Sequence, residues 1–209
     1  MIACLFDFDG VVADTESQYS IFWHQMGVEY LERDDFENII KGQTLTNIYN
    51  TYFDGMTSAQ AQITAKLDAF EQQMKYEYVP GFLEFYDDLR AHDDVHTAIV
   101  TSSDVKKMSA AYAYQPQLRS LFDAIFTAEM FAHSKPAPDC YLLGMKHFGT
   151  TIENTYVFED SMNGLRSARA SGAKVVGLST TFPASQVAQL SDVVLPDFRG
   201  FTYQKLLQV

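Results

Sequence analysis

Several kinds of residue are scarce in this sequence, and each shortage excludes a class of protein. Only two cysteines, Cys4 and Cys140, occur in 209 residues, and no Cys/His cluster has zinc-site spacing. A disulfide framework is therefore not expected, and free thiols fit a reducing compartment. No segment approaches the ~18 apolar residues that span a bilayer. Because the first Lys or Arg is Arg33, we expect no secretory signal and a cytoplasmic protein.

Positive charge is also scarce. The chain has 15 Lys and Arg against 27 Asp and Glu, which gives a formal net charge of −12. This balance argues against nucleic acid or an anionic membrane surface as a partner. It is compatible with a small anionic substrate, because exposed charges are screened over roughly 8 Å at physiological salt and a local cation outweighs them.

The most informative stretch lies near the N-terminus, where an apolar run ends in two acids and a glycine. Residues 2–6 are apolar without clean alternation, which is typical of a buried strand. Asp7 and Asp9 follow, and Gly10 permits a sharp turn. Side chains two residues apart on an extended segment point to the same side, so both acids could address one ligand at the strand end. Taken alone, the stretch fits a solvated acidic turn equally well.

A block without any strand pattern comes next. The expected helices cover residues 15–26, 34–40, 46–53 and 57–76. Gly27 is expected to end the first of them. We therefore predict an all-helical cap domain of residues 15–79, inserted into a core formed by residues 1–14 and 80–209.

After residue 81, helices and strands alternate along the chain. The expected strands cover residues 97–100, 124–127, 156–158, 174–178 and 192–195. Such alternation indicates βαβ units. The predicted fold class is α/β, with a Rossmann-like parallel sheet as its core and the helical cap as an insertion.

Polar side chains follow several of these strands. They are Asp7 and Asp9, Thr101 and Ser102, Lys135, and Glu159 and Asp160. Each group alone is ordinary, because such residues also cap helices and form turns. The carboxyl ends of parallel strands share one rim of a sheet, however, so four groups in this order favour a common site.

This ordered set resembles the haloacid dehalogenase superfamily, and within it the phosphatases and mutases that carry a helical cap after the first strand. The segment Asp7-Phe8-Asp9-Gly10-Val11 is similar to the first motif of the family, and Thr101 to the second. Lys135, in Lys-Pro-Ala-Pro-Asp, is similar to the third motif, and Glu159-Asp160-Ser161 to the fourth. The resemblance covers nearly the whole chain, and the ordered set with such a cap is highly specific.

The resemblance implies a Mg²⁺ cofactor. Its ligands would be the Asp7 carboxylate, the Asp9 backbone carbonyl and the Asp160 carboxylate, while Glu159 would order a water of the metal. The charges agree with this, because four acids and one cation, Lys135, would repel a phosphate dianion unless a divalent cation entered. Oxygen ligands are the ones that Mg²⁺ prefers.

The resemblance also implies hydrolysis of a phosphate ester through an aspartyl phosphate. Asp7 would attack phosphorus. Asp9 would protonate the departing oxygen and later deprotonate the attacking water, a role typically worth ~10²–10⁴-fold in rate. Since Asp9 must begin protonated, we expect neighbouring acids to raise its pKa. Thr101, Ser102 and Lys135 would hold the phosphoryl oxygens.

Two positions favour this phosphatase over the alternative, a β-phosphoglucomutase-type sugar phosphate mutase. Where such mutases carry a cap arginine and a hinge histidine, this chain has Leu45 and Tyr19. Without the bidentate grip of arginine on a second phosphate, a bisphosphate intermediate is disfavoured. Thr15, Tyr19, Lys41 and Gln43 are candidate substrate contacts from the cap, although packing within the cap explains Tyr19 and Gln43 equally well.

Three other functions fit less well. Dehalogenation releases a halide that needs no proton, which would leave Asp9 without a role. A phospho-receiver domain has no helical insertion and takes phosphate on an acid of a middle strand, and a catalytically silent binding domain usually loses a motif acid. We expect a monomer whose partner is a small phosphorylated metabolite, for example a sugar phosphate.

Overall fold

The computed structural model describes residues 1–41 and 43–209, and the chain divides into two compact units. Met1–Asp14 and Tyr76–Val209 form one of them, which we call the core unit. Thr15–Lys75 forms the other, the helical unit. The return to the core unit thus lies earlier in the chain than the boundary predicted after residue 79.

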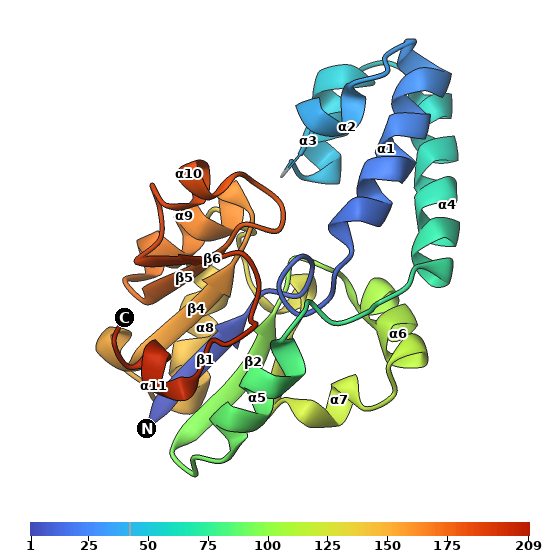
Figure 1. The fold of residues 1–209 in the computed structure, drawn as a ribbon. Coiled ribbons are helices and arrows are strands. Elements are labelled where there is room, and N and C mark those ends of the chain that lie inside the picture. Colours follow the sequence, from blue (N-terminus) through green and yellow to red (C-terminus); the bar gives the residue numbers. More distant parts are fainter. Residues whose placement is uncertain (42) are drawn as a thin grey trace. The chain divides into compact units, whose positions relative to one another are not determined.

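The core unit is built on one six-stranded sheet (Figure 1). All neighbouring strands are parallel, and the order is β3-β2-β1-β4-β5-β6. The strands are β1 (Ile2–Phe6), β2 (Val95–Val100), β3 (Ala124–Phe126), β4 (Thr155–Glu159), β5 (Lys174–Leu178) and β6 (Val193–Leu195). The predicted α/β fold with a parallel sheet is confirmed.

Strand β1 lies in the middle of the sheet and is buried along its whole length. Ala3 and Leu5 belong to the apolar cluster that covers one face of the sheet. Phe6 lies in an aromatic cluster, where its ring stacks on Phe158 with the centroids 4.3 Å apart. Because both faces are covered, the strand has no polar side, and the first polar side chain after it, Asp7, stands at its carboxyl end.

Helices flank this sheet on both sides (Figure 1). Those of the core unit are α5 (Phe82–Arg90), α6 (Val105–Tyr114), α7 (Leu118–Leu121), α8 (Asp139–Phe148), α9 (Met162–Ser171), α10 (Ala184–Val187) and α11 (Tyr203–Leu206), with 3-10 helices η1 (Ala128–Met130) and η2 (Ile152–Asn154). Helices α8 and α9 pack on β1, β2, β4 and β5. The single-turn helices α7, α10 and α11 were not predicted, because four residues are too few to show a helical period.

The helical unit contains no strand among its described residues. Its helices are α1 (Glu16–Leu31), α2 (Phe36–Ile39), α3 (Leu45–Tyr52) and α4 (Thr57–Gln73). The prediction that Gly27 ends the first helix is wrong, because α1 continues to Leu31. Gly27 serves close packing instead, since a Cβ there would lie 2.3 Å from the Cβ of Phe36.

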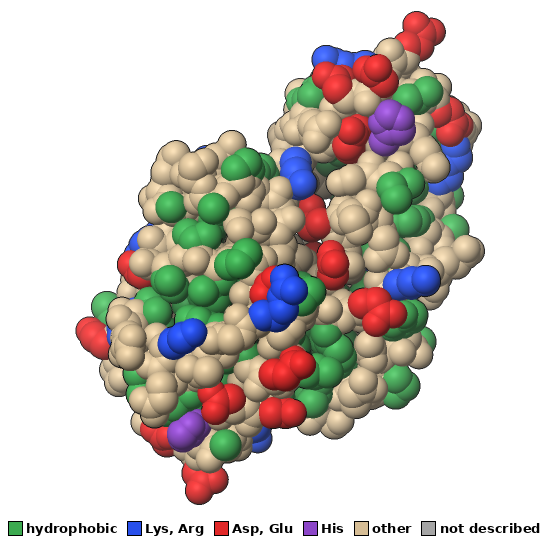
Figure 2. All heavy atoms as spheres, viewed as in Figure 1, with side chains coloured by type: hydrophobic (Ala, Val, Ile, Leu, Met, Phe, Trp, Pro, Cys, Tyr) green, Lys and Arg blue, Asp and Glu red, His purple; other side chains and the backbone are tan. Residues whose placement is uncertain are grey.

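The surface shows how the charge is spread. On the face drawn in Figure 2, Lys and Arg side chains appear as separate spots among acidic ones. Within the described ranges, each helix is too short or too polar to cross a membrane.

Candidate active site

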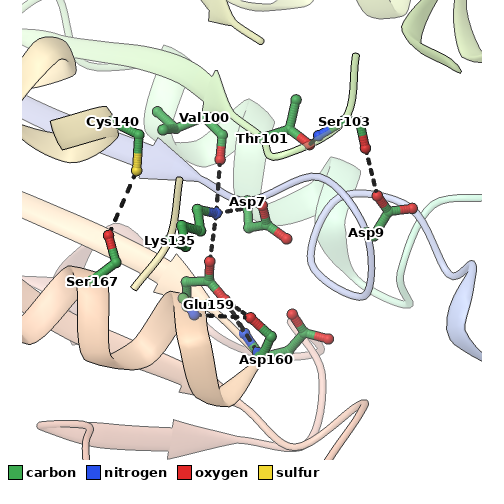
Figure 3. Close-up of polar contacts among 12 residues, drawn as sticks. Asp7, Asp9, Val100, Thr101, Ser103, Lys135, Cys140, Glu159, Asp160 and Ser167 are labelled. Atoms are coloured by element: carbon green, nitrogen blue, oxygen red, sulfur yellow. Dashed lines mark hydrogen bonds and ion pairs between the residues drawn. The ribbon is translucent and has the colours of Figure 1, made fainter. Parts of the chain in front are cut away.

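The centre of the candidate site is a buried lysine between two carboxylates (Figure 3). Lys135 Nζ lies 2.6 Å from Asp7 Oδ1 and 2.6 Å from Glu159 Oε1. It also donates to the carbonyl oxygen of Val100 at 3.1 Å. Asp7, Glu159 and Val100 come from the carboxyl ends of three adjacent strands, β1, β4 and β2. The parallel topology therefore gathers residues that are far apart in sequence around one ammonium.

Glu159 is held by several hydrogen bonds. Its side chain has no exposed surface. Its Oε2 accepts from the backbone N–H of Asp160 at 3.0 Å and from the N–H and hydroxyl of Ser161, both at 3.1 Å. Its Oε1 accepts from the Tyr141 hydroxyl at 2.8 Å. Ser161 in turn caps α9 by accepting from the Gly164 N–H at 3.0 Å, so the start of the helix fixes the acid.

Asp7, Glu159 and Asp160 form the carboxylate cluster of the site. Each contributes an oxygen, and these oxygens lie within 4.8 Å of one another. All three residues are buried. With Lys135 included, the formal charge of the cluster is three negatives and one positive. Oxygen donors of this kind, buried with an excess of negative charge, are what Mg²⁺ binds, so the residues fit the expected metal.

The protonation of the cluster reflects this charge. Burial raises the pKa of Asp7, Lys135 opposes the rise and Glu159 adds to it, and the net pKa is about 7. Burial disfavours the ammonium of Lys135, but Asp7 and Glu159 outweigh it, so the pKa of Lys135 is raised. Lys135 therefore stays a cation, while the Asp7 carboxyl exchanges its proton near neutral pH and further positive charge would favour its ionised form.

Asp9 is placed differently from the other motif acids. Its Oδ2 accepts from Lys107 Nζ at 2.6 Å and from Ser103 Oγ at 3.0 Å (Figure 3). The Lys107 and Asp9 side chains are 8% and 19% exposed, so this ion pair is largely buried. In this structure the Asp9 carboxylate therefore bonds to a cation of α6, and the raised pKa expected for it stays a prediction.

Thr101 and Ser102 follow β2. Thr101 is buried, its N–H donates to the carbonyl of Phe126 at 3.0 Å, and its Oγ1 accepts from the Ser103 N–H at 3.0 Å. Because a hydroxyl can donate one bond while it accepts others, Thr101 retains a donor for a ligand oxygen. Ser102 is exposed at the same strand end.

The four candidate substrate residues of the cap lie in the helical unit. Thr15 is buried, and Lys41 is half-buried in a turn. Tyr19 donates to Glu71 Oε1 at 2.7 Å, and Gln43 donates to the carbonyl of Ile39 at 3.0 Å. Tyr19 and Gln43 therefore have structural partners inside the unit, and a role toward substrate stays a prediction for all four.

Sequence reasoning missed several residues that contact the motif acids. They are Ser103, Lys107, Tyr141, Thr180 and Thr181. Thr180 and Thr181 follow the end of β5, so the rule that pointed to the other strand ends could have found them. Lys107 lies inside the first turn of α6 and has no such signal.

Comparisons with known proteins place these features in a family. The family model described as "Haloacid dehalogenase-like hydrolase" matches residues 4–178. The chain is 27% identical to a β-phosphoglucomutase of Mycobacterium tuberculosis, covering 93% of this chain and 89% of that protein. It is 28% identical to the fructose-1-phosphate phosphatase YqaB of Escherichia coli, covering 82% of this chain and 93% of that protein.

Two further comparisons concern length and fold. The chloroplastic protein SUPPRESSOR OF QUENCHING 1 of Arabidopsis thaliana is 27% identical over 93% of this chain, which spans 19% of that longer protein. A crystal structure of a HAD hydrolase, family IA, variant 3 from Entamoeba histolytica superposes with a TM-score of 0.83 at 22% identity. The match covers 100% of this chain and 98% of that one, and it shows the shared fold.

Proposed function

The chain belongs to the haloacid dehalogenase-like hydrolases, and from this premise we propose that it is a Mg²⁺-dependent phosphatase of a small phosphate monoester. The carrying observation is the buried cluster of Asp7, Glu159 and Asp160, in which Lys135 bonds Asp7 and Glu159. The single ammonium leaves an excess of negative charge, which a divalent cation neutralises and a phosphate dianion by itself would increase.

In the proposed reaction, Asp7 and Asp160 would hold the cation with the backbone carbonyl of Asp9. When bound there, Mg²⁺ would supply positive charge for the phosphoryl oxygens and favour the ionised form of Asp7. The Asp7 carboxylate attacks phosphorus, the ester oxygen departs, and an aspartyl phosphate remains. Water then attacks the phosphorus of that intermediate, which releases inorganic phosphate and restores the carboxylate.

The other motif residues serve these two steps. The Lys135 ammonium, the Thr101 hydroxyl and the Ser102 N–H would hold the phosphoryl oxygens as negative charge develops on them. Asp9 would give a proton to the departing oxygen and accept one from the water. To do so its carboxyl must present an oxygen to the reacting group, and in this structure Lys107 and Ser103 both engage Oδ2.

The substrate we propose is a sugar phosphate, because a fructose-1-phosphate phosphatase and a β-phosphoglucomutase align with most of the chain. A monomer acting on a small ester suffices for this chemistry. Thr15, Tyr19, Lys41 and Gln43 are the proposed contacts of the helical unit with the sugar.

The alternative is a sugar phosphate mutase, which the β-phosphoglucomutase relative favours. Two positions support hydrolysis instead. Leu45 packs against the apolar cluster of the helical unit, and Tyr19 does the same while it donates to Glu71. Neither side chain offers the cation that would hold a second phosphate.

A panel of phosphorylated metabolites, assayed for phosphate release with Mg²⁺ and with EDTA, tests the proposal. We expect release with Mg²⁺, none with EDTA, and none from Asp7→Asn, whereas the exposed Asp93→Asn should behave as wild type. Acid-quenched wild-type protein should carry a phosphoryl adduct that Asp7→Asn lacks. Conversion of glucose 1-phosphate into glucose 6-phosphate without phosphate release would favour the mutase, and turnover by Asp7→Asn would refute the nucleophile.

A further inference from the structure

Asp160 is held by a loop that none of the sequence motifs includes. It is 2% exposed and directly follows β4. Its Oδ2 accepts from the hydroxyl of Thr181, and the hydroxyl of Thr180 lies 3.4 Å from the same oxygen. Both threonines follow β5, the strand next to β4. Thr181 is itself 8% exposed, so its bond to Asp160 is shielded from water.

The same loop is tied to the turn after β1. Thr180 Oγ1 donates to the carbonyl oxygen of Gly10 at 2.6 Å. A Cβ built on Gly10 would lie 1.9 Å from Asp160 Oδ2 and 3.1 Å from Thr181 Oγ1, so the three residues are in close contact. The loop is also bonded to β6, because the Ser179 N–H donates to the carbonyl of Leu195 at 2.8 Å. The Asp160 carboxylate is therefore enclosed by groups that are themselves fixed.

We propose that Thr181 is a positioning residue that orients the Asp160 carboxylate for the metal. The inference rests on the proposed function, since it concerns the Mg²⁺ of that site. A carboxylate on a flexible side chain must give up rotational freedom when it binds a cation, and a buried hydroxyl that already bonds one oxygen removes part of that cost in advance. Removal of such a partner of a metal ligand typically weakens metal affinity by about 10- to 100-fold.

The test is calorimetric titration of Mg²⁺ into substrate-free protein, which needs no turnover. Three variants are compared with wild type: Thr181→Val, which keeps the shape and removes the hydroxyl, Thr181→Ser, which keeps the hydroxyl, and Thr155→Val as a matched control. Thr155 is, like Thr181, a buried threonine of the core unit with a bonded hydroxyl, but it begins β4, whereas Asp160 follows the end of that strand.

We expect Thr181→Val to weaken Mg²⁺ binding by about 10- to 100-fold, with Thr181→Ser and Thr155→Val within about threefold of wild type. Unfolding midpoints in EDTA establish that Thr181→Val is folded before titration. Equal Mg²⁺ affinity in wild type and Thr181→Val would overturn the inference, as would equal losses in Thr181→Val and Thr181→Ser, which would indicate packing by the methyl group. Absence of Mg²⁺ binding by wild type would instead refute the proposed function.

Discussion

Replacement of Lys135 by methionine leaves two buried carboxylates without the cation that lies between them. Its ammonium is 2.6 Å from both Asp7 and Glu159, and its side chain is 5% exposed. Removal of one partner from a buried ion pair typically costs about 3–5 kcal/mol, because the remaining charge stays desolvated. In a domain of this size, we expect the melting temperature of the metal-free core unit to fall by roughly 6–20 °C.

The stability lost in Lys135→Met should depend on pH in a defined direction. The pKa of Asp7 is about 7 when folded and lies at 3.8 for the ordinary group, so folding takes up a proton between these values. A carboxyl with a raised folded pKa makes the free energy of unfolding fall as pH rises through that window. Because Lys135 lowers the pKa of Asp7, the variant should extend the window upward and show its largest deficit above neutral pH.

Thermal and urea unfolding in EDTA, followed by near-UV circular dichroism, measures this deficit. Trp23, the single tryptophan, belongs to the apolar cluster of the helical unit, so its fluorescence reports that unit separately. Lys66→Met is the matched control: Lys66 also lies 2.6 Å from a carboxylate, Glu29, but with side chains 40% and 50% exposed, and such pairs contribute at most about 1 kcal/mol.

A double-mutant cycle with Glu159→Gln sharpens the result. If charge is the cause, Lys135→Met and Glu159→Gln together should cost less than the sum of the single losses, with a coupling of about 0.5–3 kcal/mol. A loss in Lys135→Met no larger than in Lys66→Met, or fully additive losses in the cycle, would refute the electrostatic account of the cluster.

Four further outcomes are expected. Asp7→Asn should abolish phosphate release while circular dichroism shows a folded protein; measurable turnover would contradict its role. Chelation by EDTA should stop turnover and added Mg²⁺ should restore it; activity that survives exhaustive chelation would contradict the metal. Gly164→Ala should lower the free energy of unfolding by about 3 kcal/mol in urea titrations, because its Cβ would lie 1.8 Å from Glu159 Oε1; an unchanged midpoint would contradict the packing. Burial raises the pKa of the Cys4 and Cys140 thiols, so Ellman's reagent should label both slowly in the native protein and quickly in denaturant.

The sheet was predictable because its signal is local. Apolar runs without alternation marked the strands, and the first polar residue after each run marked its end. Glu159 shows where the rule that a polar residue marks the strand end is inaccurate. The sequence predicted a strand that ends before Glu159, but Glu159 is the last residue of β4. A buried acid inside a strand contradicts local preference. Besides its neighbours Asp160 and Ser161, Lys135 and Tyr141 from distant segments stabilise it there.

The contacts around Asp9 were not predictable in the same way. Lys107 is separated from Asp9 by 98 positions, and on the sequence it is one of two adjacent lysines in an ordinary helix start. Which of the two turns inward depends on how α6 packs beside the end of β2, and this is a property of tertiary structure. The prediction that Gly27 ends the first helix was wrong for a related reason. In the sequence, a glycine that allows close packing cannot be distinguished from one that ends a helix.

The placement of the charges connects metal and substrate. Lys135 is engaged by two carboxylates, so its attraction for a phosphoryl group is partly offset before any ligand arrives. The cluster keeps a net negative charge that repels a dianion at short range, where salt screens little. A divalent cation would cancel this excess, so bound metal would favour phosphate and, by thermodynamic reciprocity, bound phosphate would favour metal to the same degree. Under the proposed function, a protein of net charge −12 would therefore select an anionic ester, because the selection would depend on a few buried charges and not on the sum over its surface.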